Sequence, residues 1–415
     1  MNSYAIVILI TLLLRYALEI IADILNLQAL RPEPPAELKG VYDVDAYRRS
    51  QAYTRMQTHF AWCTTTFMLV VTLVFWFAGG FQTLDHLVRR WHLGLIETGL
   101  AYIGILVAAR ELLSLPFRIY STFVIEARFG FNTTTPLTFV TDTLKGLGLV
   151  VLLGGPLLAG VLACFAYVGT SAWFYCWIVT TLFLLGLQLL VPTWILPLFN
   201  TFTPLPQGAL KEAILAYARS VMFPVDDVYV MDGSRRSSKS NAFFTGFGKH
   251  KRIALFDTLV TAHTVPELVA VVAHEVGHYK QRHILQRVVL SILHTGVMFF
   301  LLSVFLRHAG LFQAFYVAEP SIYTGLVFFG LLYAPVELLL SVFLQMVSRQ
   351  HEYAADAYAV HTTDDPAVLT SALKKLAAHN LANLTPHPFY VFLHYSHPPM
   401  WQRLQAIQRP QAQTG

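Results

Sequence analysis

Charged residues are scarce in this chain. Asp, Glu, Lys and Arg together make up 13% of its 415 residues, which is about half the share found in ordinary soluble domains. Hydrophobic residues make up 55%, and the mean hydropathy is +0.53. A composition this apolar excludes an ordinary soluble domain and indicates a protein embedded in a lipid bilayer.

Paired cysteines and basic runs are also missing. The three cysteines, Cys63, Cys164 and Cys176, show no C-x-x-C spacing, which argues against both a thiolate zinc site and a disulfide framework. The formal net charge of +5 is not gathered in a basic run interleaved with aromatic residues. Nucleic acid is therefore not an expected partner.

Long apolar windows take the place of these features. A helix needs about 20 mostly apolar residues to cross a bilayer. Seven windows approach that length, at 4–25, 60–78, 95–116, 145–168, 171–196, 286–306 and 322–346. The first has no small-residue cleavage site and contains Arg15 and Glu19, so we expect a retained span and not a signal peptide. The predicted fold is mainly α, a multi-pass membrane protein with seven transmembrane helices.

Basic residues mark one side of the membrane. The loops after the first and third windows hold Arg31, Arg48, Arg49, Arg55, Arg118, Arg128 and Lys145. Cytoplasmic loops carry an excess of Lys and Arg. We therefore expect the first, third and fifth loops and the C-terminus to face the cytoplasm, with the N-terminus outside.

Ionisable side chains also fall inside the windows. They are Glu19, Asp23, Glu97, Arg110, Glu111 and Glu337. Each would cost a few kcal/mol if it faced lipid, so such residues turn toward a bundle interior or water. Their number supports an internal cavity between the helices.

The chain divides into four segments. Residues 1–200 carry the first five membrane helices, 201–285 form a cytoplasmic α+β segment, 286–347 carry the last two membrane helices, and 348–415 form a C-terminal cytoplasmic segment. Within the second segment, 207–222 has the pattern of an amphipathic helix, and 228–232, 240–248 and 251–260 have that of short strands. Thr264 and Pro266 suit the start of the next helix.

That helix carries the sequence HEVGH, from His274 to His278. Residues four apart lie on one face of a helix, so both imidazoles can bind one Zn²⁺ ion at about 2.0–2.1 Å. Glu275 points about 100° away from them, where it can take a proton from the water that the metal activates. H-E-x-x-H is therefore typical of a zinc site with its own general base.

A catalytic zinc ion needs a third protein ligand and one open position. Of the downstream glutamates, Glu319 is expected on the wrong side of the membrane and Glu337 in the middle of a span. Glu352 follows the last window, level with the two histidines, and is the predicted ligand. Asp356, four residues later on the same face, could bind the far nitrogen of a ligand histidine. His351 points away from Glu352.

Several stretches besides HEVGH and SRQHEYAAD resemble the CAAX prenyl protease 1 family of integral-membrane zinc metalloendopeptidases. They are RPEPPAELKGVYDVDAYRRSQAY, FVIEARFGFNTTTPLTFVTDTLKG, LPLFNTFTPL, SNAFFTGFG and HYSHPPMWQR, in the order that the family has them. The resemblance implies seven helices around a large chamber, capped by a small α+β gluzincin-like zinc protease domain. It also implies hydrolysis of prenylated CAAX peptides.

The same resemblance assigns residues to roles. It implies that Zn²⁺, one ion per chain, is held by His274, His278 and Glu352, with Glu275 as base. Asn241 matches a substrate-contacting asparagine, and His397 and Arg403 match a pair near the scissile carbonyl. From the residues alone, Asn241 lies on an edge strand to which a peptide could add, and His397 and Arg403 could donate to an oxyanion. His294, inside the sixth span, is either a group that lines the chamber or, as we expect, a satisfied core histidine, and Arg282 and His283 are expected to lie at the membrane interface.

Two other kinds of protein remain open. One is a quality-control membrane protease that cuts misfolded or stalled membrane proteins. The other is a channel or transporter with structural zinc, which a closed shell of four ligands would mark. A site-2-type protease fits less well, because Asp232–Gly233 precedes the zinc helix. The expected partners are a peptide or protein substrate, with or without a prenyl group, and membrane lipid, for a monomer in the inner membrane of a bacterium or in the endoplasmic reticulum.

Overall fold

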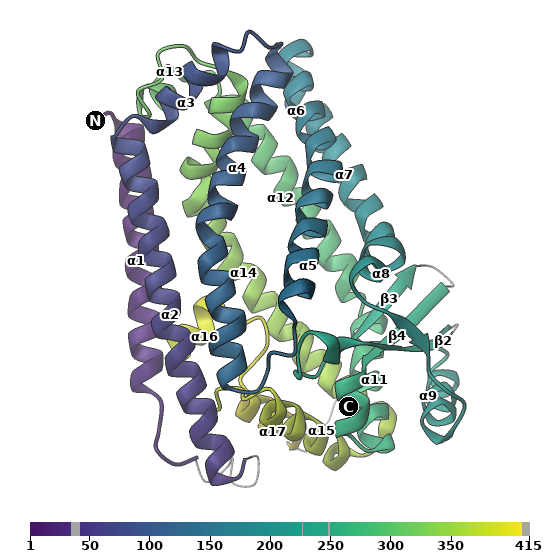
Figure 1. Cartoon of the computed structure of the whole chain (residues 1–415). Coiled ribbons are helices and arrows are strands. Elements are labelled where there is room, and N and C mark those ends of the chain that lie inside the picture. The colour runs from purple at the N-terminus through teal and green to yellow at the C-terminus, as the bar shows by residue number, and fades with distance from the viewer. Residues whose placement is uncertain (35–41, 226, 248–249, 409–415) are drawn as a thin grey trace, which may run out of the picture.

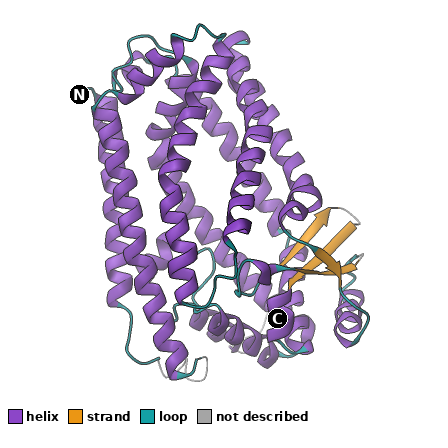
Figure 2. Cartoon of the chain, viewed as in Figure 1, coloured by secondary structure: helices purple, strands orange, loops and turns teal. Residues whose placement is uncertain are grey.

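The computed structural model describes residues 1–34, 42–225, 227–247 and 250–408. Parts of the predicted first cytoplasmic loop (35–41), the end of the predicted strand 240–248 and the tail 409–415 lie outside the described residues. Long helices stand side by side, and the few strands sit together at one end of them (Figures 1 and 2). The molecule therefore has a helical cage and, at the lower end of Figure 1, a smaller α+β cap.

Seven helical segments of the described chain are long and apolar enough to cross a membrane, as predicted. They are α1 (Ser3–Gln28), α2 (Val44–Phe77), α4 with a π-helical end (Leu95–Glu126), α5 and α6 (Pro136–Tyr167), α7 and α8 (Gly169–Phe199), α12 (His283–Phe305) and α14 (Ile322–Thr363). Most extend beyond the predicted windows. At 42 residues, α14 continues from the last span into the cap without a break.

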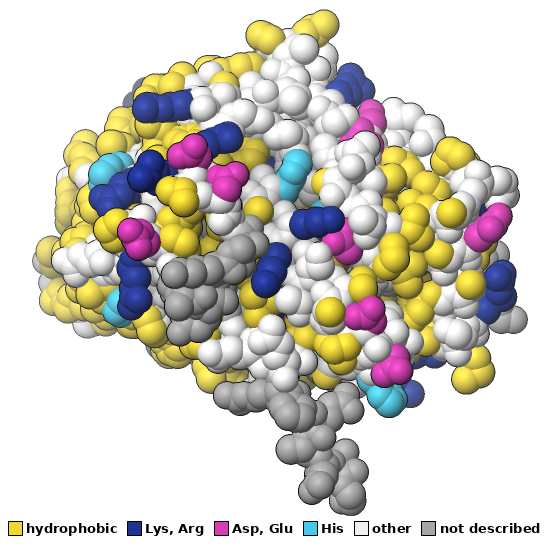
Figure 3. All heavy atoms as spheres, turned by 90° about the horizontal axis from the view of Figure 1, so that it is seen from below, with side chains coloured by type: hydrophobic (Ala, Val, Ile, Leu, Met, Phe, Trp, Pro, Cys, Tyr) yellow, Lys and Arg dark blue, Asp and Glu magenta, His cyan; other side chains and the backbone are white. Residues whose placement is uncertain are grey.

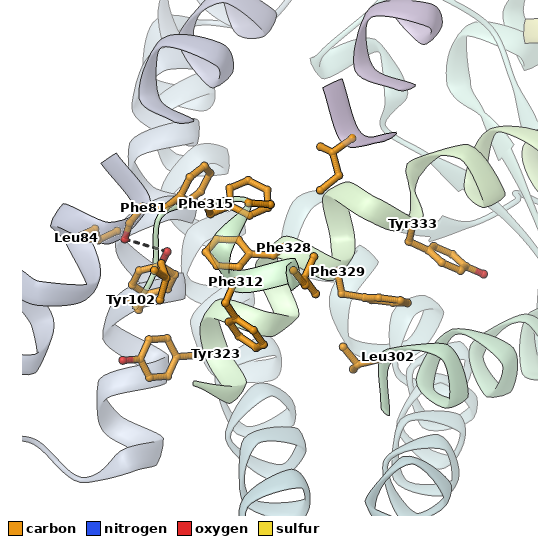
Figure 4. Close-up of a cluster of buried hydrophobic side chains, with 14 of the residues drawn as sticks. Phe81, Leu84, Tyr102, Leu302, Phe312, Phe315, Tyr323, Phe328, Phe329 and Tyr333 are labelled. Carbon is orange, nitrogen blue, oxygen red and sulfur yellow. Dashed lines mark hydrogen bonds between the residues drawn. The ribbon is translucent and has the colours of Figure 1, made fainter. Parts of the chain in front are cut away.

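An aromatic core joins the helices at the end farthest from the cap (Figure 4). Phe328 stacks on Phe315 with ring centroids 4.0 Å apart, and Phe81 meets both rings edge-on. The short helices α3 (Gly80–Arg89) and α13 (Ala309–Gln313) contribute to this core. Its one buried carboxylate, Asp85, accepts hydrogen bonds from the Tyr323 hydroxyl at 2.6 Å and from Arg89 at 2.8 Å.

The helices pack loosely between this core and the cap. Only 6% of the most apolar window in α2, and likewise in α4, is buried inside the protein. Several ionisable side chains of the spans have polar partners: Glu19 pairs with Arg15, Asp23 accepts from the Trp62 indole, and Glu111 pairs with Arg118. These ionisable side chains therefore find polar partners even though the helices that carry them are packed loosely.

The cap contains a four-stranded sheet in the order β1-β2-β4-β3. The strands are β1 (Phe202–Pro204), β2 (Asp227–Met231), β3 (Ala242–Phe247) and β4 (His250–Phe256); β2 and β4 run parallel, and the other two pairs are antiparallel. The predicted strand 251–260 ends early, because Asp257 accepts from the Thr258 and Ser234 amides and the chain turns into α10 (Asp257–Ala262). The sequence did not indicate β1.

Helices cover the sheet and complete the cap. They are α9 (Ala209–Ser220), α11 (Val265–Lys280), α15 (Pro366–His379), α16 (Pro388–His394) and α17 (Met400–Gln408). Viewed from below, this end carries charged and histidine side chains scattered among hydrophobic ones (Figure 3). The connections that follow the first, third and fifth membrane spans all lie at this end, and the N-terminus lies at the other (Figure 1).

The loop after α4 and the helix α5 that follows it hold the entry to strand β3. Arg236 makes two hydrogen bonds to the Asp142 carboxylate, at 2.7 and 3.0 Å, and a third to Asn200. Asn132 and Ser237 form an isolated antiparallel bridge. Cage and cap are therefore joined by specific polar contacts directly before β3, the outermost strand beside α11.

Candidate zinc centre

The zinc helix α11 is anchored at its start. Thr264 and Glu267 form the predicted cap as a reciprocal capping box, and Pro266 lies in the first turn. The Glu267 carboxylate also accepts from Ser371 and Lys375 of α15, at 2.7 and 2.8 Å. Burial alone would raise the pKa of Glu267, but Lys375 and the donors at the cap lower it to about 2. The first turn of α11 is thus fixed to the cap, ahead of the turns that carry His274 and His278.

Gly277, inside HEVGH, lets α14 approach α11 closely. A Cβ atom at this position would lie 3.0 Å from the Ala355 carbonyl oxygen and 3.1 Å from the Ala355 Cα. Both distances are tighter than most Cβ contacts in proteins, and backbone atoms do not move aside cheaply, so a larger residue here would push α11 and α14 apart by a few tenths of an ångström. The crossing brings Glu352 and Asp356 of α14 to the histidines of α11, and the sequence analysis gave Gly277 no role.

Three potential ligands converge at this crossing. His274 Nε2 lies 3.2 Å from His278 Nε2, and Glu352 carboxylate oxygens lie 3.4 Å from His274 Nε2 and 3.3 Å from His278 Nε2. Two ligands that are each about 2.0–2.1 Å from a tetrahedral zinc ion lie about 3.3–3.4 Å apart. Each of the three distances is therefore close to an edge of a zinc coordination shell, with Glu352 Oε2 facing His274 and Oε1 facing His278.

The polar chemistry of the group also fits a metal. Glu352 is 2% exposed, and its Oε2 atom has no hydrogen-bond partner in the described part of the chain. A buried carboxylate oxygen without a partner is costly, and a cation between it and the two imidazoles would remove that cost. Among the described residues, His274, His278 and Glu352 form the group that could hold a metal ion.

Glu275 lies beside this group on the next position of α11. Burial raises the pKa of its carboxyl group, against the opposing effect of His274 and His278. A raised pKa brings a carboxylate closer to the range in which it can both accept and return a proton near neutral pH. Glu275 is thus suited to the work of a general base.

The two histidines have different second partners. His274 Nδ1 lies 2.8 Å from Asp356 Oδ1, and Arg403 of α17 binds that carboxylate through Nε at 2.8 Å and Nη2 at 2.6 Å. Burial alone would lower the pKa of His274, but Asp356 and Glu352 raise it to about 9. The Nδ1 atom of His278 lies instead 3.0 Å from His283 Nδ1.

The other predicted residues lie at different distances from the centre. His397 Nε2 is 3.3 Å from Glu352 Oε1, with 63% of the side chain exposed, and Arg403 Nη1 is 3.7 Å from Glu352 Oε2. Asn241 is exposed directly before β3, and its carbonyl accepts from the Phe256 amide. The structure thus brings the ligands, Asp356, His397 and Arg403 together and places Asn241 at the start of the edge strand.

His283 was expected at the membrane interface; it is the first residue of α12, one of the candidate spans, and its 4% exposed side chain lies against His278. The expectation that His294 is a satisfied core histidine needs correction. Its ring stacks on Tyr333, which is 7% exposed, but its Nε2 atom has no hydrogen-bond partner in the described chain. His351 does not compete with Glu352, because it stacks on His283.

Fold and site together define a class: a multi-pass membrane metalloprotease of the H-E-x-x-H type, in which Glu352 of the last membrane helix meets the two histidines. Residues 23–201 match a family model described as CAAX prenyl protease N-terminal, five membrane helices, and residues 204–411 match peptidase family M48. Within that class, the chain belongs to the CAAX prenyl protease 1 family.

Similar proteins span almost the whole chain. The rice CAAX prenyl protease 1 homolog is 35% identical over 97% of this chain and 96% of its own. The CAAX prenyl protease 1 of Saccharomyces cerevisiae is 34% identical (90% and 88% covered), and the human homolog is 32% identical (90% and 88%). A crystal structure of S. mikatae Ste24p matches with a TM-score of 0.93 at 32% identity, covering 98% of this chain and 100% of that one.

These comparisons establish the activity class and the fold. The chain is a zinc-dependent endopeptidase of the membrane. Its seven candidate membrane helices and small sheet match the Ste24p fold, and a chamber between the helices is consistent with that fold.

Proposed function

We propose that this endopeptidase cleaves peptides held in extended form along β3, and that its substrates include the C-terminal CAAX segment of prenylated proteins. The observation that carries the proposal is the position of β3, an outer strand in contact with α11, the helix that bears His274 and His278. An extended peptide can add to such an edge through main-chain hydrogen bonds. The names of the similar proteins support the CAAX substrate.

Each residue has a proposed part in the reaction. Zn²⁺ held by His274, His278 and Glu352 would supply a polarised scissile carbonyl and a water whose pKa is lowered to about 7. Glu275 accepts the proton of that water and later returns it to the leaving amine. Asn241 orients the peptide at the start of β3.

His397 and Arg403 are the proposed donors to the developing oxyanion. The side chain of His397 is free enough to turn toward a substrate, because 63% of it is exposed. Arg403 is held more firmly: its Nε and Nη2 atoms are bound to Asp356. Only its third nitrogen remains for substrate, so Arg403 also orients Asp356 and, through it, His274.

The placement in the membrane is part of the proposal. The zinc centre would face the cytoplasm, since the connections rich in Arg lie at the same end as the cap. The membrane would be the inner membrane of a bacterium or the endoplasmic reticulum of a eukaryote. The four segments 1–200, 201–285, 286–347 and 348–415 would work as one monomer in contact with lipid.

Cleavage of matched peptides by the purified protein tests the substrate. A farnesylated CAAX peptide and its unprenylated twin are incubated with the wild type and with Glu275→Gln, and the products are identified by mass spectrometry. We expect the wild type to release the last three residues and the variant to do so about 10²–10⁴-fold more slowly. If the wild type cuts an unfolded membrane protein but neither CAAX peptide, the substrate is that of a quality-control protease.

A further inference from the structure

His278 contacts another histidine through Nδ1, the ring nitrogen that does not face the other proposed ligands. Its Nδ1 atom lies 3.0 Å from His283 Nδ1, with the two rings at 72° to each other. We propose that His283 is a positioning residue of the zinc centre: it accepts a hydrogen bond from His278 Nδ1–H and so fixes the ring and tautomer in which His278 can bind the metal. This inference rests on the proposed metal site.

The position of the protons follows from the geometry. His278 presents Nε2 to the other ligands, since that atom lies 3.3 Å from Glu352 and 3.2 Å from His274 Nε2. A neutral imidazole that binds a metal through Nε2 carries its proton on Nδ1. His283 Nδ1 must then be the acceptor, which places the proton of His283 on its Nε2 atom.

A second ring holds His283 in this orientation. His283 and His351 stack face to face, with centroids 3.9 Å apart and planes only 10° apart. His351 is itself fixed, because its Nε2 lies 2.7 Å from the Gln286 side-chain oxygen. His283 and Gln286 belong to α12, which leads from the cap into the membrane, and His351 belongs to α14, which returns from the membrane to the cap, so both helices help to hold His278.

The turn between α11 and α12 makes this contact possible. On a continuous helix, a residue five positions after His278 would point about 140° away from it. Here α11 ends at Lys280, and Arg282 adopts the left-handed conformation with φ 58°. The chain therefore changes direction directly before His283, whose ring comes back to His278.

The two ligand histidines are therefore supported unequally. His274 donates to a carboxylate that Arg403 neutralises, whereas His278 donates to an uncharged ring. Anionic acceptors form stronger hydrogen bonds than neutral ones. Support of His278 thus depends more on the shape of the turn and on ring stacking than on charge.

Zinc affinity of purified variants in detergent tests the inference, measured by competition with a chromophoric chelator. His283→Leu removes the acceptor at similar volume, and His283→Asn restores an oxygen at the position of Nδ1. Loss of such an outer partner costs about 10–100-fold in metal affinity. We expect a loss in this range for His283→Leu, with affinity near that of the wild type for His283→Asn.

A second pair of variants leaves His283 in place. Arg282→Gly and Arg282→Val both delete the guanidinium group, but a β-branched residue opposes φ > 0 whereas glycine accepts it. We expect Arg282→Val to bind zinc several-fold more weakly than Arg282→Gly. This pair decides the question if His283→Leu fails to fold.

The outcomes separate this inference from the metal site itself. A wild-type protein without bound zinc would refute the proposed centre. Zinc bound to the wild type, with unchanged affinity in His283→Leu, or equal affinities for the two Arg282 variants if the leucine variant does not fold, would refute only the role of His283.

Discussion

The cap and the cage are built on opposite principles. In the cap, nine of the sixteen residues of α11 are buried, among them Glu267 and His274. In the cage, only 6% of the apolar window of α2 or α4 is buried, and the three buried residues of α4, Thr98, Gly99 and Tyr102, all lie at its end far from the cap. The cage is thus held by its aromatic core at one end and by the cap at the other.

The difference follows from what each part must do. Zinc chemistry requires ligands fixed within a fraction of an ångström, which close packing and hydrogen bonds to the ligands provide. The membrane helices can pack loosely, because a bilayer does not penalise their apolar outer faces. Substitutions that act on one part alone can test this division.

Glu275→Gln gives the largest expected effect, and it changes the packing of neither the cage nor the cap. The amide cannot accept the proton of the attacking water, so we expect peptide cleavage to fall by about 10²–10⁴-fold. We expect zinc content to stay at the wild-type level, because Glu275 is not in the group that could hold the metal. Initial rates and metal content of the same preparations check both statements. Cleavage at the wild-type rate would show that another group is the base.

Phe328→Ala acts on the far core of the cage. The fully buried ring stacks on Phe315, and its loss should cost about 3–5 kcal/mol of stability. Thermal unfolding in detergent measures the effect, with Phe343→Ala, a 50% exposed ring on the same helix, as the control. If zinc affinity fell as far as stability, the two parts would not be independent.

Asp356→Asn acts where the two parts meet, on α14. It removes the charge that holds His274 and Arg403 but keeps the size of the side chain. We expect zinc affinity to fall by about 10–100-fold. Asp364→Asn, at the exposed end of the same helix, is the matched control and should bind zinc normally. Equal affinities in both variants would remove Asp356 from the centre.

Glu267→Gln gives the smallest expected effect, and only in the cap. The pKa of Glu267 is lowered to about 2 in the folded protein, so its stabilisation is complete above the ordinary pKa of about 4.5 and is lost as pH falls from there toward 2. The variant should lose on the order of 2 kcal/mol at neutral pH and show a flatter decline in acid. Melting curves with chelator present, from pH 7 to pH 3, measure this. Parallel curves for both proteins would contradict it.

The sequence was sufficient for features that depend on local pattern. Apolar length predicted the seven spans, and Thr264 and Pro266 predicted the start of α11. The spacing of His274 and His278 indicated the pair that converges with Glu352. The motif resemblance predicted the family that the comparisons then showed.

Features that depend on helix crossings and turns were not visible. Gly277 matters because α14 passes against it, and His283 matters because Arg282 reverses the chain. The bond of Arg403 to Asp356 joins residues 47 positions apart. The histidine five residues after His278 was a usable signal, but only once the helix is known to end between them.

Anomalous diffraction at the zinc absorption edge, from crystals of the purified protein, tests the central claim most directly. The account predicts one strong peak at about 2.0–2.1 Å from His274 Nε2, His278 Nε2 and a Glu352 carboxylate oxygen. A zinc-loaded protein with no peak among these three residues, or with its peak on a different set of ligands, would contradict it.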